Sequence, residues 1–148
     1  MRIQQEILDF ITSQRVGVLA IEMPDGSPHA ATVHFAHTDD PLIFYFETNK
    51  DYRKSEALFR KDLSRASFVI GTDEGIMKTF QTDGAVQLVK PEGMEEFKSI
   101  YLGKFNEKKD KSKDPKFVAF TFAPSWWRYT NFGGPQGKLI LTSEEKDK

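Results

Sequence analysis

The sequence predicts a mainly β protein with short helices, whose antiparallel sheet closes fully or partly into a small barrel. Apolar runs of strand length recur between clusters of turn-forming residues along the chain. Most neighbouring runs are joined by short connections of the hairpin type, which argues against a parallel sheet with helical crossovers. Phe occurs 13 times among 148 residues, and aromatic side chains at this density favour cross-strand packing in a β-rich core. A barrel is favoured because it hides the sheet edges.

The first third of the chain predicts one helix and three strands. Residues 3–13 carry apolar side chains at roughly helical spacing and predict a short amphipathic helix. Residues 16–22 form an apolar run of strand length. Turn residues at 24–27 join this run to a second strand over 29–37, so the two predict a hairpin. A third strand is predicted over residues 42–48.

The middle of the chain predicts a second helix and two further strands. Residues 51–62 place a few apolar side chains among charges, which suits a short helix with one buried stripe. Residues 66–71 predict a fourth strand, and residues 77–89 predict a long fifth strand. Gly84 lies inside the fifth strand, where a glycine indicates a bulge or a close approach of another backbone.

The last third predicts a helix, an exposed loop and the closing strands. A helix over residues 91–102 begins with a proline, which suits a first turn. Residues 104–116 are rich in lysine and lack apolar periodicity, so we expect an exposed loop with a solvated face. Residues 117–122 alternate as a strand, which continues after a bend through 126–129. Residues 139–141 predict a short last strand.

Composition excludes several classes of function. The chain has no cysteine, which rules out disulfides, zinc ribbons and thiol catalysis. Its net charge of −1 gives no general attraction to nucleic acid or to an anionic membrane. No apolar run approaches the ~20 residues that span a bilayer, and the first residues lack the core of a signal peptide. We expect a single cytoplasmic domain over residues 1–148, with a helix within 1–14 and a frayed tail over 143–148.

Polar residues cluster where the third strand leads into the second helix, from Thr48 to Lys54. Arg53 can bind two oxygens of a phosphate at once, and Lys54 adds a point charge. Thr48 supplies a short hydroxyl donor, and the first N–H groups of a helix add positive partial charge. The alternative is that both cations are ordinary solvated helix residues, which are common.

Two other clusters give weaker predictions. His29, His34 and His37 share one predicted strand, but positions 34 and 37 point to opposite faces, so we predict no metal site. The lysine-rich loop predicts no nucleic-acid interface. The sequence contains no phosphate-binding loop of the Walker type, no dinucleotide glycine fingerprint and no nucleophile elbow.

An ordered series of short segments resembles the FMN-binding split-barrel family, whose best-known member is pyridoxamine 5′-phosphate oxidase. The segments are Val18–Ile21, Asp25–Gly26, His29–Phe35, Phe44–Thr48, Arg53–Lys54, Ala57–Leu58, Ser67–Ile70 and Gly84–Ala85. The resemblance implies a six-stranded antiparallel Greek-key split barrel of the FMN-binding type. It lies closer to the small general-stress-protein-like relatives than to the true oxidase, because no arginine follows Arg128 to bind a substrate phosphate.

The resemblance implies that Thr48, Arg53 and Lys54 bind the FMN phosphate. The sequence departs from the family at Tyr52, where the family usually has a serine that supplies a further small donor.

The resemblance also implies that Thr32, Val33 and His34 lie along the isoalloxazine ring, mainly through backbone groups. Gln81 stands on a strand that reaches the flavin in relatives, although the oxidase places its glutamine closer to Thr79 of this sequence.

Family members form homodimers with the flavin at the interface, so Trp126 and Trp127 are expected near the second face of the flavin. Adjacent residues on a strand point to opposite faces, so at most one of them faces a given pocket. The alternative places one Trp in the core and the other at the dimer interface.

The predicted function is that of an FMN-dependent oxidoreductase acting on an unidentified small substrate, with no catalytic residue assigned. A flavin- or ligand-binding module without turnover is one alternative. The other is a barrel that has lost the flavin and acts as an interaction protein. Relatives of this barrel also use a deazaflavin or haem in place of FMN, and the sequence leaves these cofactors open.

Overall fold

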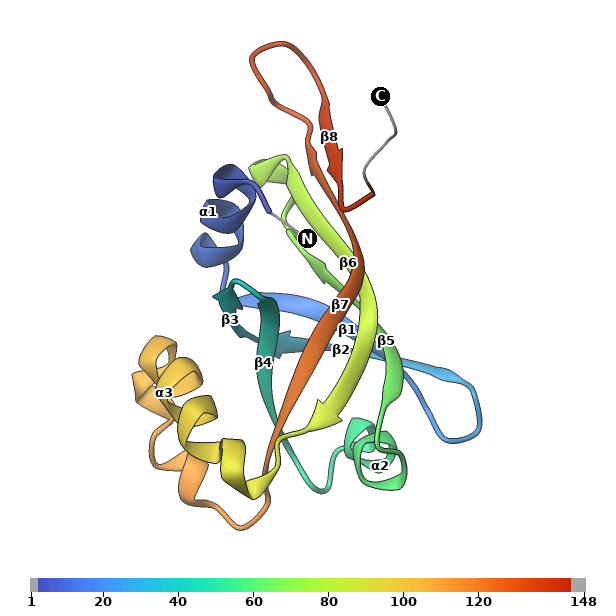
Figure 1. The fold of residues 1–148 in the computed structure, drawn as a ribbon, viewed down its shortest axis with the longest axis vertical. Coiled ribbons are helices and arrows are strands. Elements are labelled where there is room, and N and C mark those ends of the chain that lie inside the picture. Colours follow the sequence, from blue (N-terminus) through green and yellow to red (C-terminus); the bar gives the residue numbers. More distant parts are fainter. Residues whose placement is uncertain (1–2, 145–148) are drawn as a thin grey trace.

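Short apolar runs become eight antiparallel strands of one curled sheet in the computed structural model, which describes residues 3–144 (Figure 1). The strands follow the order β2-β1-β5-β6-β7-β4-β3, with β8 paired to β7. Their bounds are β1 Val16–Glu22, β2 Pro28–His34, β3 Ala36–Asp39, β4 Leu42–Asn49, β5 Ser64–Ile70, β6 Lys78–Leu88, β7 Phe117–Asn131 and β8 Leu139–Thr142. Residues 145–148 of the predicted tail lie outside the described residues.

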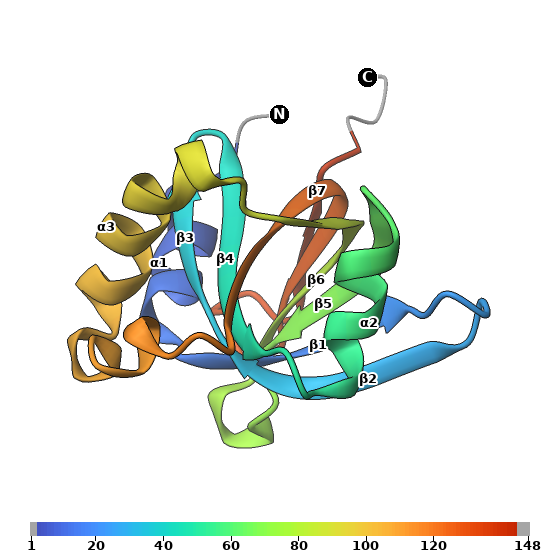
Figure 2. The ribbon, with the colours of Figure 1, turned by 90° about the horizontal axis from the view of Figure 1, so that it is seen from below.

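Within residues 3–144, three helices and four short 3₁₀ turns accompany the sheet. They are α1 Gln5–Ser13, α2 Arg53–Arg60 and α3 Met94–Lys104, with η1 Glu74–Ile76, η2 Pro91–Gly93, η3 Asn106–Lys108 and η4 Lys111–Lys113. Figure 2 shows α3 beside β3 and β4, and α2 on the opposite side of the barrel. The three predicted helices are thus confirmed. No helix within residues 3–144 is long and apolar enough to cross a membrane.

The predicted fold class is confirmed, but the predicted number of six strands is wrong. The expected strand over 29–37 is divided at Phe35 into β2 and β3, which form opposite edges of the sheet. The Phe35 side chain is fully buried and packs edge-on against Phe44 and Phe68 at 5.3–5.8 Å. The chain thus passes from one edge of the sheet to the other at this buried residue.

The interior of the barrel is filled by aromatic side chains, as the high Phe count predicts. Phe46 stacks on Phe120 at 5.1 Å between ring centroids and meets Phe68 edge-on at 5.0 Å. The predicted close approach at Gly84 is also confirmed. A Cβ atom there would lie 2.1 Å from the Ala123 carbonyl oxygen, and the β6–β7 register shifts at this residue.

A second buried cluster lies outside the barrel, where α3 covers β3 and β4. Phe97, Tyr101 and Phe105 are fully buried there against Tyr45. The prediction of an exposed loop over 104–116 is therefore wrong in part. The segment forms η3 and η4, and its lysines do not all face solvent.

Candidate functional site

The barrel is open between two strand edges, which we call the split. On one side of the split, β2 pairs with β1 and, among the described residues, with no other strand. On the other side, β3 pairs with β4 only as far as Tyr45, so residues 46–49 of β4 pair with β7 alone. The two edges lie close together, since Phe35 is the only residue between β2 and β3.

The backbone of β2 offers free hydrogen-bonding groups to the split. The Phe35 N–H donates to the Arg15 carbonyl at 3.1 Å, and the Met23 N–H donates to the Ser27 carbonyl at 2.7 Å. Odd-numbered residues of this ladder therefore bond across to β1, and the groups of Thr32 and His34 point to the open edge. The backbone of Val33 faces β1 and its side chain is buried in the core, so Val33 does not offer the expected contacts.

Five polar side chains gather at the split, and we call them the split cluster. They are His34 on β2, Glu47 on β4, Tyr101 on α3, Lys108 on η3 and Lys111 on η4. The Glu47 carboxylate is 6% exposed, and its Oε1 accepts hydrogen bonds from Lys108 Nζ and Lys111 Nζ, each at 3.0 Å. Lys108 is itself only 12% exposed.

Electrostatics in the split cluster are dominated by Glu47. Burial alone would raise the pKa of Glu47, but the hydrogen bonds from Lys111 and Lys108 outweigh it and lower the pKa. The other carboxylate oxygen, Oε2, is buried and accepts no hydrogen bond from any described residue. Burial and the nearby Glu47 raise the pKa of Tyr101, which stays a neutral phenol. The cluster is therefore a charged site with one acceptor left over.

The three expected phosphate ligands lie in different surroundings. Thr48 points into the barrel, where its hydroxyl is buried and has no hydrogen-bond partner among the described residues. Lys54 is 8% exposed, and its Nζ lies 5.0 Å from the centroid of the Tyr52 ring. Arg53 is exposed and lines a small pocket with Asp25 and other residues of the β1–β2 turn. The two neighbouring cations therefore have different surroundings.

Lys54 is close enough to the split cluster for the charges of Glu47 and Lys111 to change its pKa. Burial lowers the pKa of Lys54, the charge of Glu47 raises it, and the charge of Lys111 lowers it. The ring of Tyr52, where the family usually has serine, supplies a cation–π contact to this ammonium.

The side of the sheet that faces away from the barrel interior, which we call the outer face, adjoins the split at β2. One row crosses it in register: Thr32, Val18, Val69, Gln81 and Arg128. The Arg128 guanidinium donates to Gln81 Oε1 at 3.1 Å. Thr32 and Gln81, which are far apart in the sequence, thus share one face of the sheet.

The two adjacent tryptophans point to opposite sides of β7. Trp127 is 1% exposed and packs edge-on against Phe80 in the core at 5.8 Å. The expectation that Trp127 lines a flavin pocket is therefore not supported. Trp126 is half-buried on the outer face, across from Asp83 in register.

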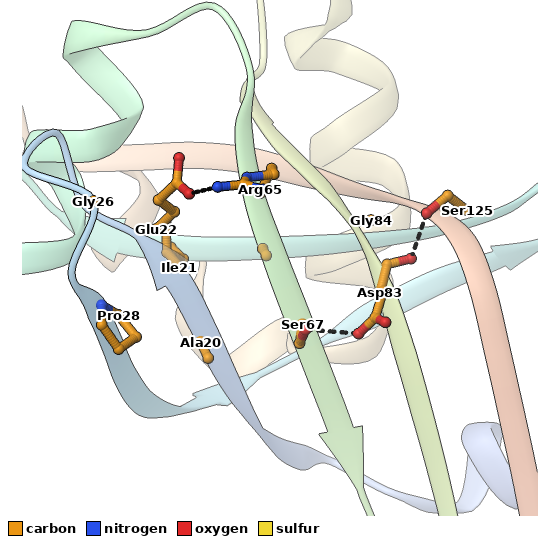
Figure 3. Close-up of a pocket in the computed structure, with 11 residues that line it drawn as sticks. Ala20, Ile21, Glu22, Gly26, Pro28, Arg65, Ser67, Asp83, Gly84 and Ser125 are labelled. Atoms are coloured by element: carbon orange, nitrogen blue, oxygen red, sulfur yellow. Dashed lines mark hydrogen bonds and ion pairs between the residues drawn. The ribbon is translucent and has the colours of Figure 1, made fainter.

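A hollow of about 650 Å³ lies at one end of the outer face (Figure 3). Glu22 pairs there with Arg65 and, at 3.3 Å, with Lys61. Ser67 Oγ donates to Asp83 Oδ1 at 2.7 Å. These charges satisfy one another, and they form a polar end of the outer face.

The histidines occupy separate surroundings. His37 Nε2 lies 3.0 Å from Asp39, and His34 contacts Lys108. Within residues 3–144 no group of three or more His, Asp or Glu side chains is arranged to hold a metal ion.

Sequence reasoning missed the split cluster because its members come from five separate elements. The one local signal was Glu47, an acidic residue inside an apolar strand. A buried carboxylate needs a cation, and the lysine-rich segment supplies it.

Comparisons with known proteins agree with this architecture. The model of the pyridoxamine 5′-phosphate oxidase family matches residues 3–131. A heme binding protein from Mycobacterium smegmatis has a TM-score of 0.73 at 17% identity, over 96% of this chain and 59% of that one. A protein related to general stress protein 26, from Clostridium acetobutylicum, has a TM-score of 0.68 at 15% identity, over 94% and 93%.

A pyridoxamine 5′-phosphate oxidase-related, FMN binding protein from Nostoc punctiforme has a TM-score of 0.65 at 15% identity, over 97% of this chain and 91% of that one. No curated protein matches the chain. The family match includes strands β1 to β7, which form both the split and the outer face. The chain therefore belongs to the pyridoxamine 5′-phosphate oxidase family.

Proposed function

We propose that the protein binds FMN with its phosphate at the split and acts as an FMN-dependent oxidoreductase on a small substrate. The observation that carries this proposal is the environment of the Lys54 side chain. The Lys54 side chain is largely buried beside the split, and its ammonium forms no hydrogen bond or ion pair with another described residue. A largely buried cation that is paired only at a distance, here with Glu47, is costly, and a bound phosphate would reduce that cost.

The residues around Lys54 fit a phosphorylated flavin. Thr48 carries a buried hydroxyl that lacks a partner, and its strand leads directly to α2. Arg53 is exposed in the first turn of α2, so its long side chain is free to reach a phosphate at that helix end. The free backbone groups of Thr32 and His34 are suited to the polar edge of the flavin ring, and Gln81 lies in the same register row as Thr32.

A second copy of the chain is the proposed partner on the outer face. Val16, Val18, Ala20 and Val69 leave this face apolar and half-buried, and small side chains allow another sheet or a planar ring to approach. In such a homodimer, Trp126 would cover the flavin bound by the partner subunit.

In this proposal the flavin supplies the electron transfer and the protein supplies binding and orientation. Lys54, Thr48 and Arg53 hold the phosphate, and the β2 edge holds the ring. The hollow beside Glu22 and Asp83 offers polar groups to a small substrate.

The test is a titration of the purified protein with FMN, followed by quenching of flavin fluorescence. We expect Lys54→Met to weaken FMN binding about 10- to 100-fold, since a hydrogen bond to a charged group contributes roughly 1.5–3 kcal/mol. Lys50→Met is the matched control, because Lys50 is exposed on the same segment. Equal FMN affinity in wild type and Lys54→Met would refute the phosphate assignment. Bleaching of the bound flavin by NADH or NADPH then separates an enzyme from a binding module.

Haem is the second candidate ligand, because the M. smegmatis structure with the same fold is a heme binding protein. His34 is the histidine at the split, but its Nδ1 already contacts Lys108. A parallel titration with haem decides between the two ligands: a Soret band that titrates to one equivalent, with no FMN binding, would replace the flavin proposal.

A further inference from the structure

Lys108 has all three of its ammonium protons engaged. Its Nζ lies 3.0 Å from Glu47 Oε1, 3.0 Å from the Tyr101 hydroxyl oxygen and 3.1 Å from His34 Nδ1. An ammonium group has three donors and no acceptor, so these three contacts use its full capacity. The side chain is also nearly buried, between the rings of Tyr101 and Phe105 at 5.4 and 5.0 Å.

The contact with Lys108 determines where His34 carries its proton. Because the ammonium can only donate, Nδ1 of His34 must accept, and the proton of the neutral ring is then on Nε2. Burial and the positive charges of Lys108, Arg15 and Lys111 lower the pKa of His34, against the opposing charge of Glu47. The neutral form is thus favoured.

The orientation of the ring is held as well. Phe105 packs against the His34 imidazole edge-on at 5.3 Å between centroids. The side chain of His34 is otherwise exposed, at the end of β2 where the backbone also faces the split. Its Nε2–H is therefore a donor of fixed direction beside the proposed flavin ring.

We propose that His34 donates a hydrogen bond from Nε2 to an acceptor on the pyrimidine part of the bound flavin, with Lys108 as the positioning residue that sets the tautomer. The acceptor is a carbonyl oxygen or ring nitrogen of that part. The contact between His34 and the flavin rests on the proposed function. The tautomer of His34 does not, because it follows from the contact with Lys108. A donor at this position gains strength as the flavin takes up negative charge on reduction, so His34 would raise the reduction potential.

The first experiment uses the flavin-free protein and long-range ¹H–¹⁵N NMR of the histidine rings. We expect His34 to show a protonated Nε2 and an unprotonated Nδ1 at neutral pH. In Lys108→Met we expect mixed tautomers and a higher pKa for His34, whereas the exposed neighbour Lys109→Met leaves both unchanged. A wild-type His34 that is protonated on Nδ1 overturns the inference, and this measurement needs no variant to fold.

The second experiment adds FMN. We expect the Nε2 proton of His34 to shift on binding, and the potential of the bound flavin to fall in His34→Leu but less in His34→Gln, which keeps a donor. An unperturbed His34 with an unchanged potential overturns the contact with the flavin. If FMN does not bind at all, the proposed function and this contact fail together, while the spectrum of the flavin-free protein still decides the tautomer.

Discussion

The two faces of β4 are built on opposite chemistry. Phe44 and Phe46 point into the barrel, where both are fully buried among aromatic rings. Glu47 points to the other side, where it forms ion pairs with Lys108 and Lys111, which lie about sixty residues later in the chain. Alternation along one strand thus separates a dry core, which stabilises the fold, from a charged cluster at the split. We therefore expect that substitutions on the two faces of β4 change stability and ligand binding separately.

We expect the largest change in stability from a substitution on the face of β4 that points into the barrel. Phe46→Ala should lower the free energy of unfolding by about 3–5 kcal/mol, because removal of the large ring leaves a cavity among packed neighbours. Urea unfolding measures this loss. The folded fraction should keep its FMN affinity. Phe59→Ala is the control, since that ring is 55% exposed and should change stability by less than about 0.5 kcal/mol. A loss of FMN affinity in folded Phe46→Ala would show that the two sides are coupled.

The next effect is on the charged side. Glu47→Gln should cost about 2–3 kcal/mol, slightly less than the usual cost of breaking a buried ion pair, because the amide keeps some hydrogen bonding. The folded-state pKa of Glu47 is lowered, so its stabilisation is present above pH 5 and is lost as the pH falls through that pKa. Acid unfolding curves should therefore be flatter in Glu47→Gln. An unchanged acid transition would mean that Glu47 is not the linked group.

A smaller effect is expected at Lys104, where α3 meets α1. Its Nζ donates to the Gln14 carbonyl at 2.5 Å, and burial lowers its pKa to about 8. The unfolded state then binds more protons between pH 8 and pH 10, so stability should rise with pH in that window. The slope of the unfolding free energy against pH must stay below about 1.4 kcal/mol per pH unit, which is the value for one full proton. Thermal unfolding at several pH values should show this rise in wild type and not in Lys104→Met.

The smallest effect is expected at the surface pair Arg65–Glu22. The Arg65 side chain is 85% exposed, and exposed ion pairs contribute about 0–1 kcal/mol. Arg65→Ala should therefore change urea unfolding little, even though the pair lines the hollow of Figure 3. A larger loss of stability would mean that the hollow is part of the structural core of the protein.

The dry side of β4 could be predicted from sequence, and the charged side could not. The spacing of Phe44 and Phe46 follows directly from the two-residue period of a strand, so one run of residues contains all the information. The same period predicted that Trp126 and Trp127 lie on opposite sides of β7, which the structure confirms. It did not say which of them is buried.

The split cluster depends on contacts between elements that are distant in the chain. Lys108 lies in a segment without apolar periodicity, and solvated lysines are the usual outcome for such a run. Only the curling of the sheet, which carries α3 and η3 over β4, brings Lys108 to Glu47. The division of the second strand at Phe35 also escaped prediction, because no glycine or proline marks that position in the sequence.

In the proposed function, Lys54 receives the phosphate of the flavin at the split. The most direct measurement compares the dissociation constants of FMN and riboflavin, which differ only in that phosphate, for wild type and Lys54→Met. We expect that wild type binds FMN more tightly than riboflavin and that Lys54→Met removes most of this advantage without weakening the binding of riboflavin. Equal binding of the two flavins by wild type, or an FMN advantage that survives in Lys54→Met, would contradict it.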